Sequence, residues 1–416
     1  KVGPMSVMLP IEERMDDIAH YYVDILRPAQ PISDEAVHAV LDEWKSINSL
    51  SLRSKEHTME NMKKSSNSGV PFWSKRRNDV LETLRSKVYK WSPRRQDTII
   101  DFSADDLGDF TAAAVVGWRG QEGGPKEDDI KQRVVWMFPF AVNLEELRVY
   151  QPLIEAAQTT NLVPAWVSMG AVDKEITALF DTKGRDDLII CTDFSKFDQH
   201  FNKEMQKCAR TILYQLIDKG DKDKRYWFEN IFPIKYEIPL IYGNVPFKLG
   251  KNEPGYKCFF GKHGMGSGSG GTNADETLTH RALQHEVAIT HGQKLNLHSM
   301  CLGDDGILTY PGITVDDVVQ AYESHGQECN ISKQYASTQE CIYLRRWHHI
   351  NYRIDGVCAG VYSTYRALGR MRYLERFMDP EVWSPEAVEL RWLSIIENAN
   401  NHPLFEQFVQ FCMKRD

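Results

Sequence analysis

The sequence predicts an α+β fold in which short strands mix with longer helices. An apolar run at residues 188–192 stops at an Asp, which is typical of a buried strand. Apolar runs at 300–302 and 307–310 flank the tetrapeptide Gly303-Asp304-Asp305-Gly306, and this pattern predicts a β-hairpin. Residues 199–219, 272–291 and 314–326 have the pattern of helices. No internal repeat is present.

The other segments complete this prediction from the N-terminus onward. Residues 11–50 are expected to be mostly helical, and residues 60–78, which are rich in turn formers, are expected to form a loop. Helical spacing returns at 78–91, and a mixed region at 104–150 is broken at 123–125. Aromatic and β-branched runs predict short strands and loops at 229–262. Thr314 and Asp317 form a candidate capping box. About the last 65 residues are expected to be helical, with a break near Asp379-Pro380.

The composition is that of an ordinary globular protein. A chain of 416 residues can bury a large core in one to three domains. No apolar run approaches the roughly 18 residues of a membrane span, and no signal peptide is visible, so no membrane partner is expected. The eight cysteines contain no CxxC pair. They indicate reduced, buried thiols rather than disulfides or a zinc site.

The charge is unevenly distributed. A net charge of −8 argues at first against nucleic acid binding. Residues 51–95, however, carry 12 Lys and Arg against 4 Asp and Glu, which is +8 locally and leaves −16 elsewhere. A basic surface inside an acidic protein suits a channel that binds a nucleic acid strand. A solvated helix face with interspersed charges explains the same stretch equally well.

Two acidic motifs are candidates for metal chemistry. Asp193 follows the predicted strand, and Asp304 and Asp305 lie on the predicted hairpin turn. If the hairpin pairs beside residues 188–192, Asp193 and Asp304 meet. Clustered carboxylates repel one another, and hard cations such as Mg²⁺ offset that cost. Two such ions, roughly 3.5–4 Å apart, stabilise an attacking 3′-oxygen and a leaving pyrophosphate. The alternative is structural, because Asp is also an ordinary turn and cap residue.

A glycine-rich loop lies between the acidic motifs. Gly266, Gly268 and Gly271 match GxGxxG, but no clean apolar strand precedes them and no Lys-Ser/Thr follows. A flexible linker is one explanation. Against it, the run leads directly into the helix predicted from residue 272. Such a loop lets the backbone approach a sugar or phosphate closely.

A basic segment precedes the acidic motifs. Lys131 and Arg133 point the same way if residues 131–136 form a strand. Together with Arg119 they can clamp a triphosphate and neutralise a leaving pyrophosphate. An amphipathic edge strand is the alternative.

In combination, these residues resemble the viral RNA-dependent RNA polymerase family. The family's motifs occur in its order between residues 65 and 346: Ser68-Gly69-Val70-Pro71 resembles motif G, Lys131-x-Arg133 motif F, Asp193-x4-Asp198 motif A, Ser267-Gly268-x3-Thr272 motif B, Gly303-Asp304-Asp305 motif C, Lys333 motif D, and Cys341-Ile342-Tyr343-Leu344-Arg345-Arg346 motif E. The sequences of these motifs are most similar to those of the polymerases of picobirnaviruses, which are small double-stranded RNA viruses. Partitivirus-type enzymes come next.

The resemblance implies a right-hand fold of fingers, palm and thumb around a channel. The expected domains are fingers at 1–180, palm with motif A at 181–204, a fingers insertion at 205–262, palm with motifs B to E at 263–346, and thumb at 347–416. It implies an enzyme that replicates and transcribes a viral RNA genome from nucleoside triphosphates. Two Mg²⁺ ions, for which Mn²⁺ can substitute, are the expected cofactors.

The resemblance also implies roles for individual residues. Asp193 and Asp304 are the expected catalytic metal ligands, and Asp305, close by, is a further expected catalytic and metal-binding residue. Lys333 is the expected general acid for the pyrophosphate. The residues expected to bind the nucleotide, including the 2′-hydroxyl that distinguishes RNA precursors, are Asp198, Ser267, Gly268, Thr272, Asn273, Lys131, Arg133 and Arg119. The residues expected to contact template are Ser68, Gly69, Pro71, Lys75 and Arg76.

Two features depart from the family pattern. Glu276 stands four residues after Thr272, where the family usually has Asn. The 70 residues after Arg346 make a small thumb, so a shortened or incomplete thumb is expected.

Partners and rival functions follow from the same resemblance. RNA template and product, nucleoside triphosphates and a capsid protein are the expected partners, in host cytoplasm and inside the virion or capsid particle. A reverse transcriptase is the nearest rival enzyme, but it typically has an aromatic residue two positions before its Asp pair and a bulky gate after the first Asp. A non-catalytic RNA-binding or capsid-associated protein explains the basic stretch and leaves the acids unexplained.

Overall fold

The computed structural model describes residues 9–47, 49–92, 109–120, 132–243, 256–374 and 380–414. Lys131, the predicted break at 123–125, and Arg94 and Arg95 of the basic stretch lie outside these ranges.

A four-stranded antiparallel sheet carries both acidic motifs. Its strands are β5 (Ile189–Thr192), β8 (Met300–Leu302), β9 (Asp305–Leu308) and β10 (Tyr335–Ser337), in the order β10-β5-β9-β8. Thr192 is paired with Gly306, and Leu302 with Asp305. The predicted strand, the predicted hairpin and their pairing are therefore confirmed.

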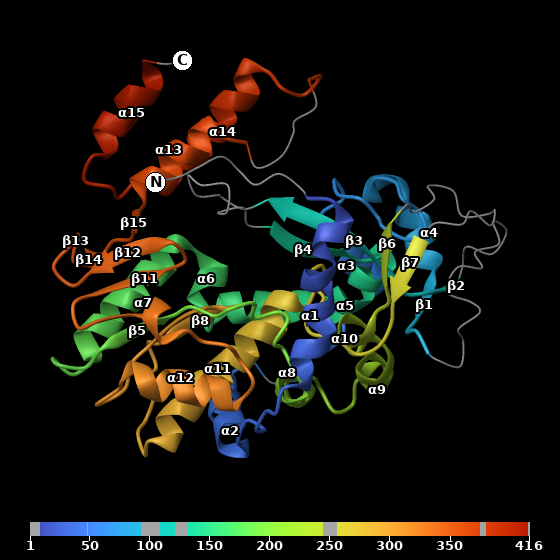
Figure 1. Ribbon diagram of the computed structural model, residues 1–416, viewed down its shortest axis with the longest axis horizontal. Coiled ribbons are helices and arrows are strands. Elements are labelled where there is room, and N and C mark those ends of the chain that lie inside the picture. The colour runs from blue at the N-terminus through green and yellow to red at the C-terminus, as the bar shows by residue number, and fades with distance from the viewer. Residues whose placement is uncertain are drawn as a thin grey trace.

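The two faces of this sheet bury different sets of side chains. Ile189 and Cys191 pack with α7 (Met169–Thr182), whereas Ile190 belongs to the main core beside α11 (Thr272–Thr290) and α12 (Val315–Ser324). This alternation is the period of two that a strand imposes. Helix α11 also contacts α2 (Asp34–Glu43) and α8 (Lys203–Leu216). It thus forms a central support beneath the sheet (Figure 1).

A second sheet lies beside the first, on the right of Figure 1. Its order is β4-β3-β6-β7, with β3 (Ala114–Gly120), β4 (Gln132–Met137), β6 (Leu240–Gly243) and β7 (Tyr256–Phe259). The parallel pair β1 (Lys87–Tyr89) and β2 (Asp109–Thr111) lies near it. The helices of this half are α3 (Lys55–Glu60), α4 (Val80–Arg85), α5 (Phe140–Thr159), α9 (Lys224–Tyr226) and α10 (Ile234–Glu237). Helix α1 (Met15–Val23) passes in front of the boundary between the halves.

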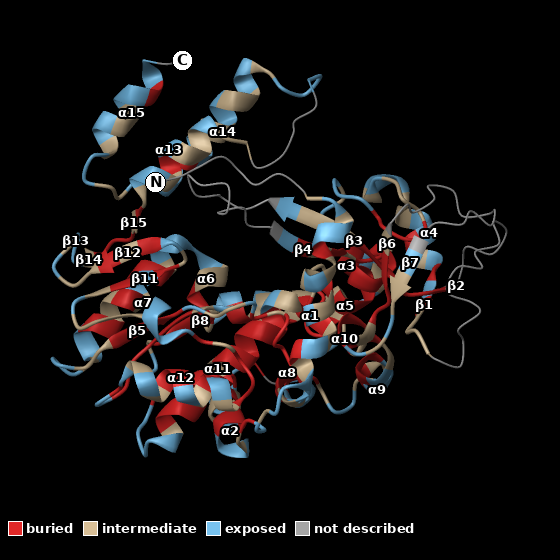
Figure 2. Ribbon diagram, in the orientation of Figure 1, coloured by how far each residue is buried: buried red, intermediate tan, exposed pale blue. Residues whose placement is uncertain are grey.

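The C-terminal part begins with small strands and ends with three helices. Strands β11 (Glu340–Tyr343), β12 (Arg346–His349) and β15 (Val361–Tyr362) form one sheet, and β13 (Arg353–Ile354) pairs with β14 (Val357–Cys358). Helices α13 (Thr364–Arg372), α14 (Pro385–Asn398) and α15 (Phe405–Met413) stand apart at the top of Figure 1. Figure 2 shows that buried residues gather around the two sheets and α11, while these last helices are mostly exposed or half-buried.

Several predicted segments are confirmed and others are wrong in part. The helices at 11–50, 199–219 and 272–291 and the loop at 60–78 are present, and the hydroxyl of Thr314 accepts a hydrogen bond from the Asp317 N–H as a cap. Residues 78–91, predicted helical, hold α4 followed by strand β1. Residues 229–237, predicted as strands and loops, are helical, because their aromatic side chains pack on all sides into the core. Residues 353–362, predicted helical, form short strands.

The cysteines and the helices agree with the composition. All eight thiols are free, and seven are buried. Across the described ranges, none of the helices combines the length and apolar character that crossing a bilayer requires.

The hairpin turn is fixed by helix α11. The Gly303 N–H donates to Thr277 Oγ1 at 2.9 Å, and Gly303 O lies 2.8 Å from His280 Nδ1. Gly303 has φ of +59°, where glycine is favoured. A Cβ on Gly306 would lie 2.5 Å from His280 Cε1. Glycine at both positions therefore lets the turn lie against the helix.

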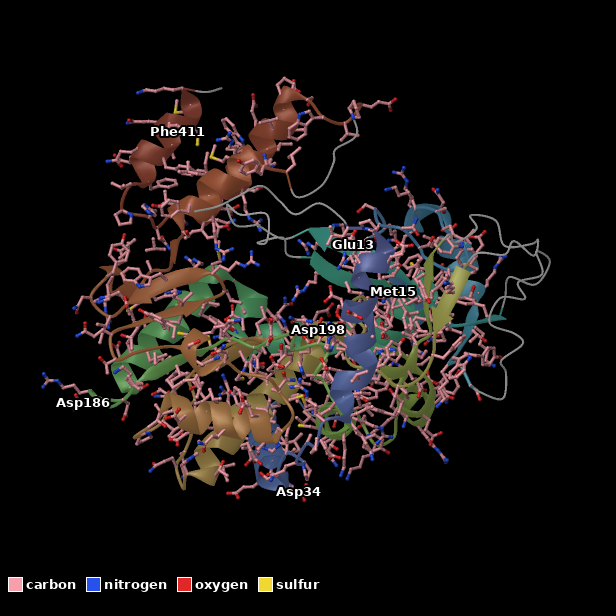
Figure 3. The ribbon with its side chains drawn as sticks, viewed as in Figure 1. Glu13, Met15, Asp34, Asp186, Asp198 and Phe411 are labelled. Atoms are coloured by element: carbon pink, nitrogen blue, oxygen red, sulfur yellow. The ribbon has the colours of Figure 1, made fainter. Side chains whose placement is uncertain are left out.

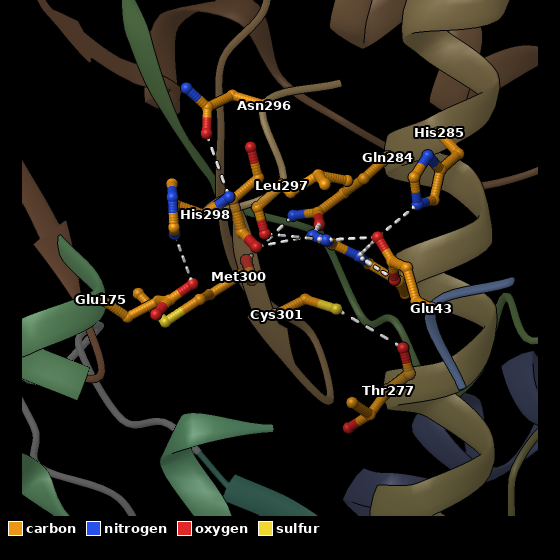
Figure 4. A network of polar contacts seen from close by, with 12 residues as sticks. Glu43, Glu175, Thr277, Gln284, His285, Asn296, Leu297, His298, Met300 and Cys301 are labelled. Atoms are coloured by element: carbon orange, nitrogen blue, oxygen red, sulfur yellow. Dashed lines mark hydrogen bonds and ion pairs between the residues drawn. The ribbon is translucent and has the colours of Figure 1, made fainter. Parts of the chain in front are cut away.

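Further along, α11 holds both strands of the hairpin and helix α2 (Figure 4). Arg281 Nη2 contacts Glu43 Oε1 at 2.7 Å, and Arg281 Nη1 donates to Ser299 O. Gln284 Nε2 donates to Met300 O at 2.9 Å and to Ile307 O at 3.2 Å. One face of the helix thus sets the position of the acidic turn.

His280 lies in an aromatic environment that disfavours its charged form. Its ring contacts those of Phe194, Phe197 and Tyr322. Burial lowers the pKa of His280 to about 4. At neutral pH the imidazole is therefore neutral, and the tautomer with a proton on Nδ1 can donate to Gly303 O.

This depressed pKa predicts a specific loss of stability in acid. A neutral His280 contributes its full stability above about pH 6.5, and the contribution falls as the pH drops toward 4, by about 2 kcal/mol at pH 5. Asn at position 280 keeps a donor near Nδ1 and does not titrate. We expect His280→Asn to show a smaller difference in unfolding free energy between pH 7.5 and pH 5 in urea titrations. His38→Asn, on the exposed part of α2, is the control. An unchanged difference in His280→Asn would contradict this account.

Candidate active site

Asp193 and Asp304 meet at one end of the central sheet. Asp193 directly follows β5, and Asp304 occupies the turn between β8 and β9, which is paired to β5. Both residues keep solvent-exposed surface, although the carboxyl of Asp304 is packed among other groups of the protein. Burial raises the pKa of Asp304, and the charges of Asp198 and Asp193 act in the same direction. The predicted convergence is therefore present, together with its electrostatic cost.

Asp305 has a different setting from its neighbour. Its Oδ2 accepts a hydrogen bond from the Leu344 N–H at 2.9 Å, at the turn between β11 and β12. Leu344 and Arg345 have φ of +50° and +64°, so this turn needs an external anchor. Burial raises the pKa of Asp305 to about 7. One oxygen of Asp305 is thus already engaged by the turn, which leaves the other for a metal ion. The metal role of Asp305 stays a prediction.

A cavity of about 190 Å³ opens beside Asp304 and Asp198. Its wall comes from four parts of the chain that are far apart in sequence. Figure 3 shows Asp198 near the centre of the molecule, next to α1. The lining residues include Asp17, Tyr21, Arg133, Lys196, Asp198 and Asp304. Carboxylates and cations thus surround a space that a charged small molecule can enter.

The glycine loop is packed against the first acidic motif. The Ser267 hydroxyl donates to the Asp198 carboxylate, and the Met265 N–H donates to Asp198 O at 2.8 Å. A Cβ on Gly264 would lie 2.3 Å from Asp198 O, and one on Gly268 would lie 1.5 Å from Trp136 O. The flexible-linker explanation is wrong, because the backbone here is in close contact on both sides.

Thr272 and Asn273 open helix α11 with different partners. Thr272 Oγ1 lies 3.3 Å from both Gly266 O and Ser269 O, so its hydroxyl closes the glycine loop. Asn273 Oδ1 accepts from Trp166 Nε1 at 2.8 Å. The amide nitrogen of Asn273 remains close to Gly303, 3.6 Å from where a Cβ would stand.

Glu276 is a buried carboxyl beside the acids. Burial, and then the charge of Asp198, raise the pKa of Glu276 well above its usual value. A hydrogen bond to Asp198 acts in the same direction. These influences favour the protonated carboxyl, which carries one donor and one acceptor, as an amide does. Its position where the family usually has Asn is thus chemically consistent with that family's pattern.

Two arginines approach the cavity from the second sheet. Arg119 on β3 is paired with Arg133 on β4, and both are exposed. Burial lowers the pKa of Arg133, but the charges of Asp198 and Asp304 outweigh burial and raise it. The guanidinium of Arg133 is therefore a fixed positive charge facing the acids. Lys131, predicted to act with it, lies outside the described residues.

The segment with Lys333 is tied to Asp193. Gln334 Oε1 accepts from the Asp193 N–H at 2.9 Å, and Gln334 Nε2 donates to Asp193 O at 2.8 Å. Lys333, the residue before it, is exposed. This places the lysine close to the acidic end of the sheet.

The predicted template residues divide into two groups. Ser68, Gly69 and Pro71 are buried, and the Ser68 hydroxyl donates to Ser74 O at 2.9 Å. Their burial indicates that they shape the loop, and their contact with the RNA template stays a prediction. Lys75 is exposed, whereas the guanidinium of Arg76 is turned into the protein toward Asn143.

Tyr21, Asp17 and Lys196 are among the cavity residues that were missed from the sequence. Tyr21 and Asp17 come from helix α1, whose Tyr21 O accepts from the Gly264 N–H at 2.8 Å. No local motif could have placed this helix there, since only tertiary packing does so. Lys196 has φ of +56° inside motif A, and its Nζ lies 3.5 Å from Asp17 Oδ1. Its position between the two predicted acids was the available signal.

The donor atoms suit a hard divalent cation. In the described part of the chain, no three His, Cys, Asp or Glu side chains form a ready-made metal cage. Mg²⁺, however, is usually held by one or two carboxylates together with substrate phosphates and water. Asp193 and Asp304 supply two carboxylates at one end of the sheet, and Asp304 lines the cavity. Burial raises the pKa of Asp304 and the charges of Asp198 and Asp193 add to this, a cost that a bound cation would offset.

Comparisons with known proteins agree with this geometry. The chain is 55% identical over 416 residues to the potential RNA-dependent RNA polymerase of a human picobirnavirus, covering 100% of this chain and 74% of that protein. The crystal structure of the RNA-dependent RNA polymerase of a human picobirnavirus matches with a TM-score of 0.90 and 54% identity, covering 100% of this chain and 76% of that one. An insertion-loop deletion mutant of such an enzyme matches with a TM-score of 0.90 and 53% identity, covering 100% and 78%. The family described as viral RNA-dependent RNA polymerase matches residues 12–410. This match extends from the first described residues into α15, and the chain therefore belongs to the family of viral RNA-dependent RNA polymerases.

Proposed function

We propose that this polymerase replicates and transcribes a viral double-stranded RNA genome by two-metal nucleotidyl transfer. The observation that carries the proposal is the pairing of β5 with β9, which brings Asp193 next to Asp304. Asp304 lines a cavity together with Asp198, which accepts a hydrogen bond from Ser267. The right-hand fold of the family, with its antiparallel palm sheet, supports it.

Asp193 and Asp304 are the proposed metal ligands. Two Mg²⁺ ions bound there, or Mn²⁺ in their place, would activate the 3′-hydroxyl of the product strand and neutralise the leaving pyrophosphate. The protein's part is to hold both carboxylates rigidly. It does so through the β5–β9 pairing and the contacts of α11 to Gly303.

Asp198, Ser267 and Glu276 form the proposed ribose site. The Ser267 hydroxyl and the neutral Glu276 carboxyl both hydrogen-bond Asp198. A 2′-hydroxyl is both donor and acceptor, and this polar group offers both kinds of partner. Gly268, Thr272 and Asn273 keep the backbone and helix start in place around it.

Arg133 and Arg119 are proposed to hold the triphosphate, with Lys131 as a further candidate. Arginine suits this role because its planar donors match phosphate oxygens. Lys333 is proposed to protonate the leaving pyrophosphate, because its segment is tied to Asp193.

The rival functions explain less. A reverse transcriptase would need a bulky gate after the first Asp, and position 198 is an acid bound to Ser267. A non-catalytic RNA-binding protein would not need the acids, their pairing or the cavity.

The domain division predicted from the sequence remains a proposal, as does the setting of the enzyme. We propose fingers at 1–180 and 205–262, palm at 181–204 and 263–346, and thumb at 347–416. Helix α8 (Lys203–Leu216) crosses the proposed boundary at residue 205 and packs on α11, so this helix joins the insertion to the palm. A capsid protein as partner, and a place in the host cytoplasm inside the particle, belong to the same proposal.

The central test is primer extension on an RNA template. We expect ribonucleotide incorporation that requires Mg²⁺ or Mn²⁺, and a loss of at least about a thousandfold in Asp304→Ala and Asp193→Ala, because each removes a ligand of the reacting centre. Asp187→Ala, in the loop before β5, is the control for loss of an acid. Incorporation that survives in Asp304→Ala, or incorporation of deoxyribonucleotides only, would overturn the proposed function.

The template placement is tested by the salt dependence of RNA binding. Lys75 and Arg77 are exposed on the loop at residues 66–79, which we call the basic loop. If each meets a phosphate, the Lys75→Ala/Arg77→Ala double variant should bind single-stranded RNA more weakly, with a slope of log K against log salt reduced by about 1.4. Lys45→Ala/Lys219→Ala, two exposed lysines away from this loop, is the matched control. An unaltered slope in the loop variant would show that the RNA template does not bind on this surface.

A further inference from the structure

One face of helix α5 supports the glycine loop. Asn143, Glu146, Leu147 and Tyr150 lie at helical spacings of three and four, so they share a face. A Cβ on Gly270 would lie 3.1 Å from Leu147 Cγ, and one on Gly271 would lie 2.3 Å from Tyr150. The loop that holds Ser267 therefore rests directly on this face.

Glu146 holds the far side of the loop. It is fully buried, and burial raises the pKa of its carboxyl. Its Oε1 accepts from the Ser269 hydroxyl at 2.5 Å, and its Oε2 accepts from the Gly270 N–H at 2.7 Å. The Gly271 N–H in turn donates to Ser269 Oγ at 3.0 Å. Both contacts fix backbone within three residues of Ser267.

Asn143 connects the loop to a second segment. Its Nδ2 donates to Gly268 O and to Glu146 Oε2, both at 3.2 Å. Its Oδ1 accepts from Arg76 Nη2 at 2.7 Å. Asn143 is only 5% exposed, so water cannot easily replace either partner. One buried amide thus joins the glycine loop to the basic loop at 66–79.

The side chain of Arg76 points into the protein toward Asn143 and not toward solvent. Its guanidinium lies over the Phe140 ring at 4.8 Å, and its Nε donates to Asn67 O at 3.3 Å. Burial lowers its pKa. Its neighbours Lys75 and Arg77 point outward and are exposed. The same short segment therefore faces solvent with two cations and faces Asn143 with a third.

We propose that Arg76 and Asn143 are positioning residues that couple template contact on the basic loop to the ribose-reading loop. The inference rests on the proposed function, since it needs a template on the outer side of the basic loop. When an RNA strand binds Lys75 and Arg77, the shift of the loop backbone is passed to Arg76. Arg76 passes it to Asn143 and then to Gly268, next to Ser267. A chain of buried hydrogen bonds is suited to this because breaking any one leaves polar groups unpaired.

The first test uses two variants that separate the inner and outer faces of the loop. Arg76→Met removes the contact to Asn143, and Arg77→Met removes its exposed neighbour. We expect Arg76→Met to raise the KM for ribonucleotides and lower the preference for ribo- over deoxyribonucleotides by about tenfold, which is the effect of one buried hydrogen bond. Its salt slope for RNA binding should stay that of the wild type. Arg77→Met should lower the salt slope and, with saturating RNA, change the KM less than Arg76→Met does, because Lys75 and the buried contact of Arg76 with Asn143 remain. Lys45→Met, an exposed residue outside the loop, should leave both quantities unchanged.

A third variant tests the other half of the contact. Asn143→Asp keeps an acceptor for Arg76 and removes the donor to Gly268. It should reproduce the KM and selectivity of Arg76→Met although Arg76 is still held. The Arg76→Met/Asn143→Asp double variant should be no worse than either single one, because both interrupt the same connection.

A readout without catalysis completes the design. In the wild type, RNA binding without nucleotide should slow amide hydrogen exchange at residues 267–271. This protection should be absent in Arg76→Met. With saturating RNA it should persist in Arg77→Met, which keeps Lys75 and the contact of Arg76 with Asn143, and it should equal that of the wild type in Lys45→Met. Where Arg76→Met fails to fold, Asn143→Asp carries the same comparison.

The outcomes separate the two claims. A wild-type protein that incorporates no ribonucleotide sinks the proposed function. A normal wild type, with Arg76→Met or Asn143→Asp equal to it in KM, selectivity and exchange, overturns only the coupling. Additive losses in the double variant would also overturn it, because they would mean two independent supports.

Discussion

The structure depends above all on the pairing of β5 with β9. This pairing sets Thr192 opposite Gly306 and so places Asp193 beside the turn that carries Asp304. A shift by one residue would turn one of the carboxylates to the other face of the sheet. Helix α11 protects the register, because Thr277 and His280 hold both polar groups of Gly303 and Gln284 reaches both strands of the hairpin. The rest of the palm can be seen as support for this one register.

The same geometry creates an electrostatic problem. Burial raises the pKa of Asp304, and the charges of Asp198 and Asp193 add to this. Burial and the charge of Asp198 likewise raise the pKa of Glu276 next to them, which favours its protonated form. Arg133 offsets part of this repulsion from the second sheet. Binding of the proposed Mg²⁺ ions would remove part of the remaining repulsion between like charges. The crowding of the carboxylates is thus a physical reason for expecting cations at this site.

The sequence predicted the parts whose signals are local. The strand before Asp193, the hairpin and the helix after the glycine loop follow from apolar runs and turn residues, and the family resemblance supplied their roles. It failed where packing overrides local pattern. Residues 229–237 are helical because the core surrounds their aromatic rings, and Tyr21 reaches the cavity only because α1 packs on the loop at Gly264. Charge alone suggested that Arg76 faces the template, whereas its contact with Asn143 turns it inward. Nothing in the sequence indicated that Asp305 differs from Asp304 by accepting a hydrogen bond from the Leu344 N–H.

The most direct measurement of the central claim is a crystal structure with Mn²⁺, an RNA primer–template and a non-hydrolysable ribonucleotide. Anomalous scattering locates Mn²⁺ without ambiguity between metal and water. We predict two peaks, roughly 3.5–4 Å apart, bridging the carboxylates of Asp193 and Asp304 and the nucleotide phosphates. Nucleotide bound in register with the template, with no metal peak at either carboxylate, would contradict the account.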